Sequence, residues 1–154
     1  MDVAVDDRTL RLSRVFDAPR ERVFAAWTDP EQFAQWFGPA GVTTVYCDLD
    51  VRVGGAWRLL GASAEGKHAV SGTYLEVKEP ERLAFTWAWH EGGDHANPRG
   101  HETVVSLDFK DVGGKTEMTM VQSRFAESSG AVNHDRGWTG SFTKLEAFLL
   151  RRDA

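Results

Sequence analysis

The chain has 154 residues, of which 42% are hydrophobic and 27% are charged, and its formal net charge is −5. These values are ordinary for one water-soluble unit with one core, so we expect residues 1–154 to form a single domain. The negative charge and the lack of a stripe rich in Lys and Arg argue against a nucleic-acid partner, because binding to phosphates depends on clustered basic side chains.

The N-terminal residues and the cysteine content restrict the class of protein further. No apolar run approaches the roughly 18 residues that a membrane-spanning helix needs, and the first residues are acidic where a secretory signal is basic. We therefore expect a cytoplasmic protein without membrane insertion. Cys47 is the single cysteine, so neither an internal disulfide nor a cysteine-based metal motif is expected. We interpret it as a small buried strand residue.

The first predicted elements are a strand and a short helix. Apolar residues alternate over 8–17, which favours a half-buried strand. Pro19 indicates the start of a helix, since proline is tolerated in the first turn. The apolar face of this helix consists of Val23, Phe24 and Trp27.

A second short helix is predicted from Asp29. Asp29 can cap its first turn, Pro30 suits its first position, and Gln32 lies three residues after the cap, as in a capping box. Its apolar stripe consists of Phe33, Trp36 and Phe37, and Gly38-Pro39 ends it.

The segment 42–125 consists of short alternating stretches separated by breaks rich in Gly. This pattern is typical of an antiparallel meander, here of about six strands. The stretch 83–90 alternates most clearly and predicts one strongly aromatic face. The inward residues of this stretch are Leu83, Phe85, Trp87 and Trp89, and those of the next two strands are Val105, Leu107, Phe109, Met118, Met120 and the polar Gln122.

A long helix over about 131–151 closes the chain. Its apolar residues recur at steps of four, three and four, at Trp138, Phe142, Leu145 and Leu149. The order of elements is therefore β-α-α-β(6)-α, an α+β arrangement. The aromatic face of the sheet has to be covered, so we expect a curved antiparallel sheet wrapped around the C-terminal helix.

Such curvature leaves space between the helix and the sheet. Gly137 and Gly140, inside the predicted helix, each cost about 1 kcal/mol relative to alanine, and we interpret them as making room. An empty void of about 300 Å³ would cost about 7 kcal/mol, comparable with the stability of a whole domain. A space of that size must hold water or a ligand, or collapse. The alternative is a solid core of interdigitated rings.

Several motifs in the correct order resemble one superfamily. The segment 18–30, APRERVFAAWTDP, and the WFGP of 36–39 resemble the opening of the SRPBCC (START-like, Bet v 1-like) superfamily. The motifs at 54–58, 72–77 and 80–87, with Gly137-Trp138, resemble the branch named for the C-terminal domain of the activator of heat-shock protein 90 ATPase. The resemblance covers about residues 10–150. It implies the helix-grip fold and a hydrophobic cavity.

The resemblance does not imply activation of the chaperone, which also needs an N-terminal domain of the eukaryotic activator that we do not expect in this chain. Many relatives carry a His near the end of the last strand, where this chain has Gln122. Any function that depends on that His is therefore not expected here.

The candidate site is an aromatic cavity. Flat apolar molecules stack on aromatic rings, so we expect a small hydrophobic or aromatic ligand and predict neither a metal nor a cofactor. No catalytic residue is assigned. The predicted cavity residues are Trp36, Trp57, Tyr74, Trp87, Trp89, His101, Gln122, Phe125, Trp138 and Phe142.

Two other classes of function stay open beside ligand binding. A cavity-based enzyme of the cyclase or dehydratase type needs an acid or base, for which the candidates are His101 with Glu102 and Tyr74 with Glu76. A stress-related protein-protein interaction module needs an exposed apolar patch on the outside of the sheet. A homodimer also stays open.

The segment 91–100 is rich in Gly and is interpreted as a solvated lid. His90, Asp94, His95 and His101 lie in or beside it, but they lack the fixed spacing on one element that a metal site usually has. The lid is therefore preferred to a metal site.

Overall fold

The computed structural model describes residues 9–38, 41–125 and 128–152, and within the last range it describes the side chains of 134 and 137–150. Its elements follow the predicted order, with one strand, two short helices, six strands and a long helix. They are β1 (Leu10–Phe16), α1 (Arg20–Thr28), α2 (Pro30–Trp36), β2 (Thr43–Leu49), β3 (Ala56–Ser63), β4 (Gly66–Lys78), β5 (Arg82–Trp89), the 3-10 turn η1 (Glu91–Gly93), β6 (Thr103–Val112), β7 (Lys115–Ser123) and α3 (Ser128–Arg152).

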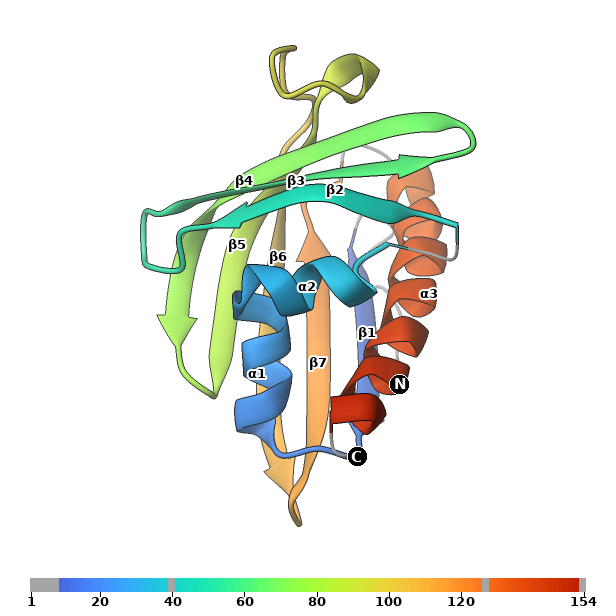
Figure 1. Cartoon of the computed structure of the whole chain (residues 1–154). Coiled ribbons are helices and arrows are strands. Elements are labelled where there is room, and N and C mark those ends of the chain that lie inside the picture. The colour runs from blue at the N-terminus through green and yellow to red at the C-terminus, as the bar shows by residue number, and fades with distance from the viewer. Residues whose placement is uncertain (1–8, 39–40, 126–127, 153–154) are drawn as a thin grey trace.

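The seven strands form one antiparallel sheet in the order β1-β7-β6-β5-β4-β3-β2. The N-terminal strand β1 extends the meander at one edge. It pairs with β7 from Leu10 opposite Gln122 to Phe16 opposite Thr116. Figure 1 shows β2, β3 and the start of β4 crossing above the helices, while β6 and β1 run downward behind them and β7, between these two strands, runs upward. The predicted curved sheet around a C-terminal helix, the helix-grip arrangement, is confirmed.

The junction of α1 and α2 differs in detail from the predicted capping box. Asp29 caps α2, since its Oδ1 accepts a hydrogen bond from the backbone N–H of Glu31 at 3.0 Å. Gln32 donates from its side-chain amide to Asp29 Oδ2, also at 3.0 Å, instead of accepting from the backbone of Asp29. The reason is that the Asp29 N–H is already bonded to the carbonyl oxygen of Ala25, in the last turn of α1. Pro39, predicted to end α2, lies outside the described residues.

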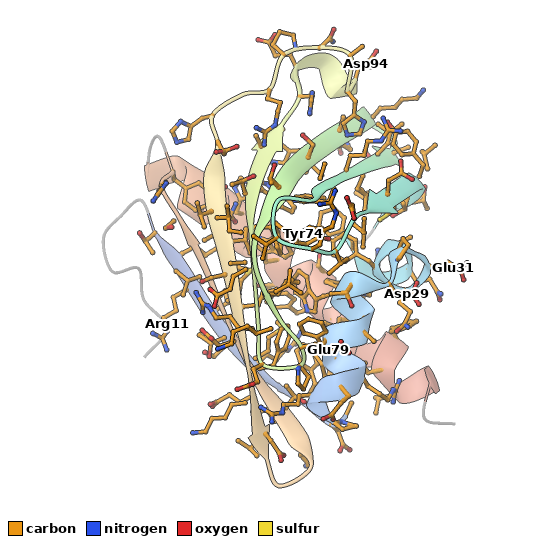
Figure 2. All side chains as sticks on the ribbon, turned by 90° about the vertical axis from the view of Figure 1, so that its left-hand side faces the viewer. Arg11, Asp29, Glu31, Tyr74, Glu79 and Asp94 are labelled. Carbon is orange, nitrogen blue, oxygen red and sulfur yellow. The ribbon has the colours of Figure 1, made fainter. Side chains whose placement is uncertain are left out.

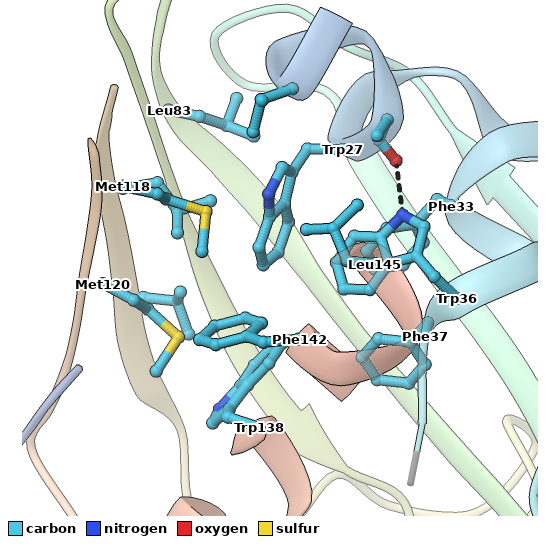
Figure 3. Close-up of a cluster of buried hydrophobic side chains, with 14 of the residues drawn as sticks. Trp27, Phe33, Trp36, Phe37, Leu83, Met118, Met120, Trp138, Phe142 and Leu145 are labelled. Atoms are coloured by element: carbon cyan, nitrogen blue, oxygen red, sulfur yellow. Dashed lines mark hydrogen bonds between the residues drawn. The ribbon is translucent and has the colours of Figure 1, made fainter. Parts of the chain in front are cut away.

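Aromatic side chains from all three helices and the sheet form the core. Trp27 is at its centre, with ring centroids 4.7 Å from Trp36, 5.8 Å from Trp138 and 6.3 Å from Phe142. Figure 3 shows these rings packed beside Met118 and Met120 of β7. The Trp36 indole donates to the carbonyl oxygen of Ala26 at 2.9 Å, so α2 is fixed against α1 by a buried hydrogen bond as well as by packing.

Within the described ranges, we find no helix that is both long and apolar enough to cross a membrane.

Candidate functional site

A pocket of about 700 Å³ opens on the concave side of the sheet. It lies between the loop that follows α2, the β3–β4 hairpin, the end of β5 and the first half of α3, and Figure 1 shows that hairpin passing above the first turns of α3. Its walls are mainly apolar, and its polar groups come from the hairpin and from α3. The lining residues are Phe37, Gly38, Gly41, Val42, Leu59, Gly61, Ser63, Ala64, Glu65, His68, Trp87, Trp89, His134, Gly137, Trp138 and Ser141.

Four of the lining side chains are large aromatic rings, and three of these rings contact the fourth, Trp87. The centroid of the Trp87 ring lies 5.0 Å from that of Trp138, 5.6 Å from that of Phe37 and 5.5 Å from that of Trp89. Trp87 and Trp89 are almost perpendicular, at 89°. Trp87 and Trp138 are each 3% exposed, whereas Trp89 is 39% exposed, so the aromatic wall reaches from the core to the surface.

One polar atom of this wall has no partner. The indole Nε1 of Trp87 is buried, and it has no hydrogen-bond acceptor among the described residues. An unmade hydrogen bond of a buried donor costs about 1–3 kcal/mol.

Gln122 holds the aromatic wall in place from behind. Its side chain is fully buried, its Oε1 accepts from Trp138 Nε1 at 2.8 Å, and its Nε2 donates to Thr103 Oγ1 at 2.9 Å. The Thr103 hydroxyl donates in turn to the carbonyl oxygen of Trp87 at 3.2 Å. This chain of hydrogen bonds joins α3 to β7, β6 and β5, so Gln122 positions Trp138 without lining the pocket itself.

Hydrogen bonds of ordinary length hold the polar groups of the pocket in position. Ser63 Oγ accepts from the backbone N–H of Glu65 at 3.2 Å and is hydrogen bonded to His68 Nε2 at 2.9 Å. On α3, His134 Nε2 accepts from Trp89 Nε1 at 3.1 Å. Ser141 Oγ accepts from the backbone N–H of Gly38 at 2.9 Å and fixes the loop after α2.

Gly137 faces the open space of the pocket. A Cβ atom added at this position would meet no heavy atom within 4 Å, so the glycine leaves a gap in the helix wall. This agrees with its interpretation as a residue that makes room. Gly140 is not among the lining residues.

The ten residues predicted for the cavity are found in six different environments. Trp87, Trp89 and Trp138 line the pocket, Gln122 lies behind it, and Phe125 contacts its rim through His134, with ring centroids 5.0 Å apart. The others lie elsewhere: Trp36 and Phe142 belong to the packed core, Trp57 and Tyr74 border a separate void of about 10 Å³, and His101 is exposed and hydrogen bonded to the carbonyl oxygen of Arg124.

Sequence reasoning missed the β3–β4 hairpin and His134 as parts of the pocket. The stretch 61–66 is rich in Gly and shows no periodicity, so by itself it indicates only a break between strands. The sequence did indicate that Phe37 faces the interior, because this residue is the last of the apolar stripe of α2. That stripe did not show that Phe37 would face Trp87.

The predicted lid over the cavity is not found, because no residue of the segment 91–100 lines the pocket. The segment lies on the side of the sheet away from α3. There His95 Nε2 donates to the carbonyl oxygen of Val70 at 3.0 Å and its Nδ1 is hydrogen bonded to the hydroxyl of Tyr46. With neighbouring strands the segment borders a second hollow of about 400 Å³, lined in part by Arg58 and Arg99.

The histidines near this segment have separate structural partners. His90 Nδ1 donates to the carbonyl oxygen of Asn97 at 2.8 Å, and its Nε2 accepts from the hydroxyl of Ser71 at 2.7 Å. Asp94 Oδ1 accepts from the backbone N–H of Ala96. In the described part of the chain, no three side chains of His, Cys, Asp or Glu are grouped as a metal site would require.

The acid-base candidates are also engaged elsewhere. Glu102 forms an ion pair with Arg99, and Glu76 one with Arg82, each at 2.8 Å. Burial, and after it the charges of Cys47 and Asp50, raise the pKa of the Tyr74 phenol well above its usual range.

Cys47 lies on β2 as a half-buried residue, whereas a buried strand residue was expected. Burial and then the charge of Asp48 raise the pKa of its thiol to about 12. The thiol stays protonated near neutral pH, which removes the thiolate that a nucleophile needs.

Comparison with solved structures finds close likeness over almost the whole chain. The crystal structure of an AHSA1 protein from Silicibacter pomeroyi is 32% identical, with a TM-score of 0.83, over 94% of this chain and 99% of that chain. A crystal structure from Chromobacterium violaceum is 29% identical, with a TM-score of 0.83, over 94% of this chain and 98% of that one.

A curated relative, an uncharacterized protein of Schizosaccharomyces pombe, is 27% identical over 109 residues, which are 69% of this chain. The match covers 26% of that relative, so the chain spans about a quarter of its length. The family described as activator of Hsp90 ATPase homolog 1-like protein matches residues 17–149. With this match over most of its length, the chain belongs to the activator of Hsp90 ATPase homolog 1-like family, within the SRPBCC superfamily.

Proposed function

We propose that the protein binds a small apolar or aromatic molecule in the pocket between the β3–β4 hairpin and α3. The observation that carries the proposal is the continuous wall of Phe37, Trp87, Trp89 and Trp138 beside an open volume of about 700 Å³. Ligand pockets generally have volumes of about 300–1,000 Å³, with apolar and aromatic walls and few polar groups.

An acyl-transfer enzyme is less well supported than binding. Ser63 and His68 are hydrogen bonded in the pocket, at the separation that a nucleophile and its base need. No described carboxylate accepts a hydrogen bond from His68, however, so the third group that orients the base is missing from the described residues.

Gly137 provides the test of the proposed function. Gly137→Leu should place a side chain in the open pocket, whereas Gly137→Ala adds one methyl group to the same helix position. Binding is measured by titration with N-phenyl-1-naphthylamine, an uncharged probe that fluoresces in apolar sites. We expect saturable binding to the wild-type protein and to Gly137→Ala. Gly137→Leu should bind at least about tenfold more weakly, because overpacking of a filled site costs about 1–3 kcal/mol.

Both variants should remain folded, since alanine and leucine favour a helix over glycine by up to about 1 kcal/mol. Thermal unfolding of the three proteins checks this. Equal probe binding by all three would rule out this pocket as the binding site, and a lack of saturable binding by the wild type would rule out the proposed function.

A further inference from the structure

The pocket has an uneven charge distribution. Among the described lining residues, one is charged when histidine is counted as neutral. This residue is Glu65, in the turn of the β3–β4 hairpin. No Lys or Arg belongs to the described lining. Lys144 of α3 is not a lining residue, and its ammonium donates to the carbonyl oxygen of the lining residue Val42 at 3.5 Å.

The carboxylate of Glu65 has no partner among the described residues. Some other carboxylates of the sheet and its loops form ion pairs with arginine, such as Asp48 with Arg58 at 2.9 Å and Glu102 with Arg99 at 2.8 Å. The Glu65 backbone N–H is bonded to Ser63, but no ion pair or hydrogen bond to a described side chain engages its carboxylate. The hairpin therefore brings to the edge of an aromatic pocket a negative charge that no described side chain compensates.

The aromatic walls of the pocket, like the carboxylate of Glu65, favour a positively charged ligand. The face of a tryptophan ring is negative because of its quadrupole, and it attracts a cation within about 6 Å of its centroid. Trp87 and Trp89 meet at 89° and both line the pocket, so they present ring surfaces in two directions. An anionic ligand would meet ring faces and a carboxylate, without a described basic side chain in the lining to neutralise it.

We infer that the pocket selects a cationic aromatic molecule, with the aromatic part against Trp87, Trp89 and Trp138 and an ammonium group held by ring faces and the carboxylate of Glu65. This inference rests on the proposed function and gives the chemical class of its ligand. An amine on a short alkyl chain next to an aromatic ring has both parts.

Three indoles with one ring system and different charges test the inference. Tryptamine is a cation, tryptophol is neutral and indole-3-acetate is an anion, and each is used to displace N-phenyl-1-naphthylamine at pH 8, where an ordinary imidazole is neutral. Tryptamine should bind at least about threefold more tightly than tryptophol and about tenfold more tightly than indole-3-acetate. The preference should decrease in high salt, which screens an exposed carboxylate.

A pair of charge-matched variants assigns the effect to Glu65. Glu65→Gln should weaken tryptamine binding about threefold and leave tryptophol unchanged, because only the ammonium interacts with the carboxylate. Glu81→Gln removes the same charge beyond the other end of β4, at an exposed position that does not line the pocket. It should leave both affinities unchanged.

If the uncharged probe binds and the three indoles compete equally, the ligand class is wrong while the proposed function stands. The inference is also overturned if indole-3-acetate binds best, or if Glu81→Gln acts as strongly as Glu65→Gln. If neither the probe nor any indole binds, both proposals are wrong.

Discussion

Gln122 is a polar residue in an apolar environment, and its hydrogen bonds explain why it is tolerated there. On β7 it follows Met118 and Met120, which are fully buried on the same face. Burial of an amide without partners is costly, but both ends of this side chain are bonded, to Trp138 and to Thr103. The residue thus sets the position of a pocket-lining ring from a site outside the pocket.

Gln122→Met tests this role. Methionine fills a similar volume but leaves the buried Nε1 of Trp138 without its acceptor, so the free energy of unfolding should fall by about 1–3 kcal/mol. Urea unfolding followed by far-UV circular dichroism measures the change. The matched control is Gln35→Met on the exposed side of α2, which should change the stability by less than about 0.5 kcal/mol. Equal changes in the two variants would contradict the role of the buried hydrogen bond.

At the scale of elements, Asp29 connects two helices that together cover one end of the sheet. Its backbone N–H completes the last turn of α1, while its carboxylate caps α2. The short α2 carries Phe33 and Trp36 into the core and is followed by Phe37 at the pocket. The capping interaction therefore helps to determine the direction in which three aromatic residues point.

Asp29→Ala should lower the free energy of unfolding by about 1 kcal/mol, because the N–H of Glu31 loses its acceptor. Asp29→Asn keeps an acceptor oxygen at the same position and should retain most of the stability. Chemical unfolding of the two variants separates the cap from other effects of the substitution. A loss in Asp29→Asn as large as that in Asp29→Ala would indicate that the charge, and not the hydrogen bond, is the cause.

At the scale of the whole molecule, the sheet separates two regions with different contacts. The concave side contains the aromatic core and the pocket, whereas the segment 91–100 packs on the opposite side. Figure 2 shows this segment, marked by Asp94, above the strands and away from the central Tyr74. Changes in that segment should therefore reach the pocket only through the stability of the sheet.

Replacing one histidine from each of the two regions by alanine tests this separation. His95→Ala removes the hydrogen bonds to Tyr46 and Val70 and should lower stability by about 1 kcal/mol, with the affinity for N-phenyl-1-naphthylamine unchanged within about twofold. His134→Ala removes a lining side chain that accepts from Trp89, so it should change the affinity by more than that. If His95→Ala lowered the affinity as much as His134→Ala, the segment would act on the pocket after all.

The sequence by itself determined the order of elements, the aromatic face of the sheet and the helical stripe through Trp138 and Phe142. These features are periodic, and periodicity reflects which side of a strand or helix is buried. Trp87 and Trp89 could be assigned to the inner face in this way, and the family could be recognised from short motifs in order.

Only the tertiary structure decided which inward rings border open space and which are packed. Trp36 and Phe142 have the same periodic signal as Trp138, but they are surrounded by rings from other elements, and the volume left over depends on how far the sheet curves. The β3–β4 hairpin and the segment 91–100 are alike in composition, being polar and rich in Gly. One borders the pocket and the other folds onto the opposite side because of hydrogen bonds between residues distant in sequence, which local patterns do not encode.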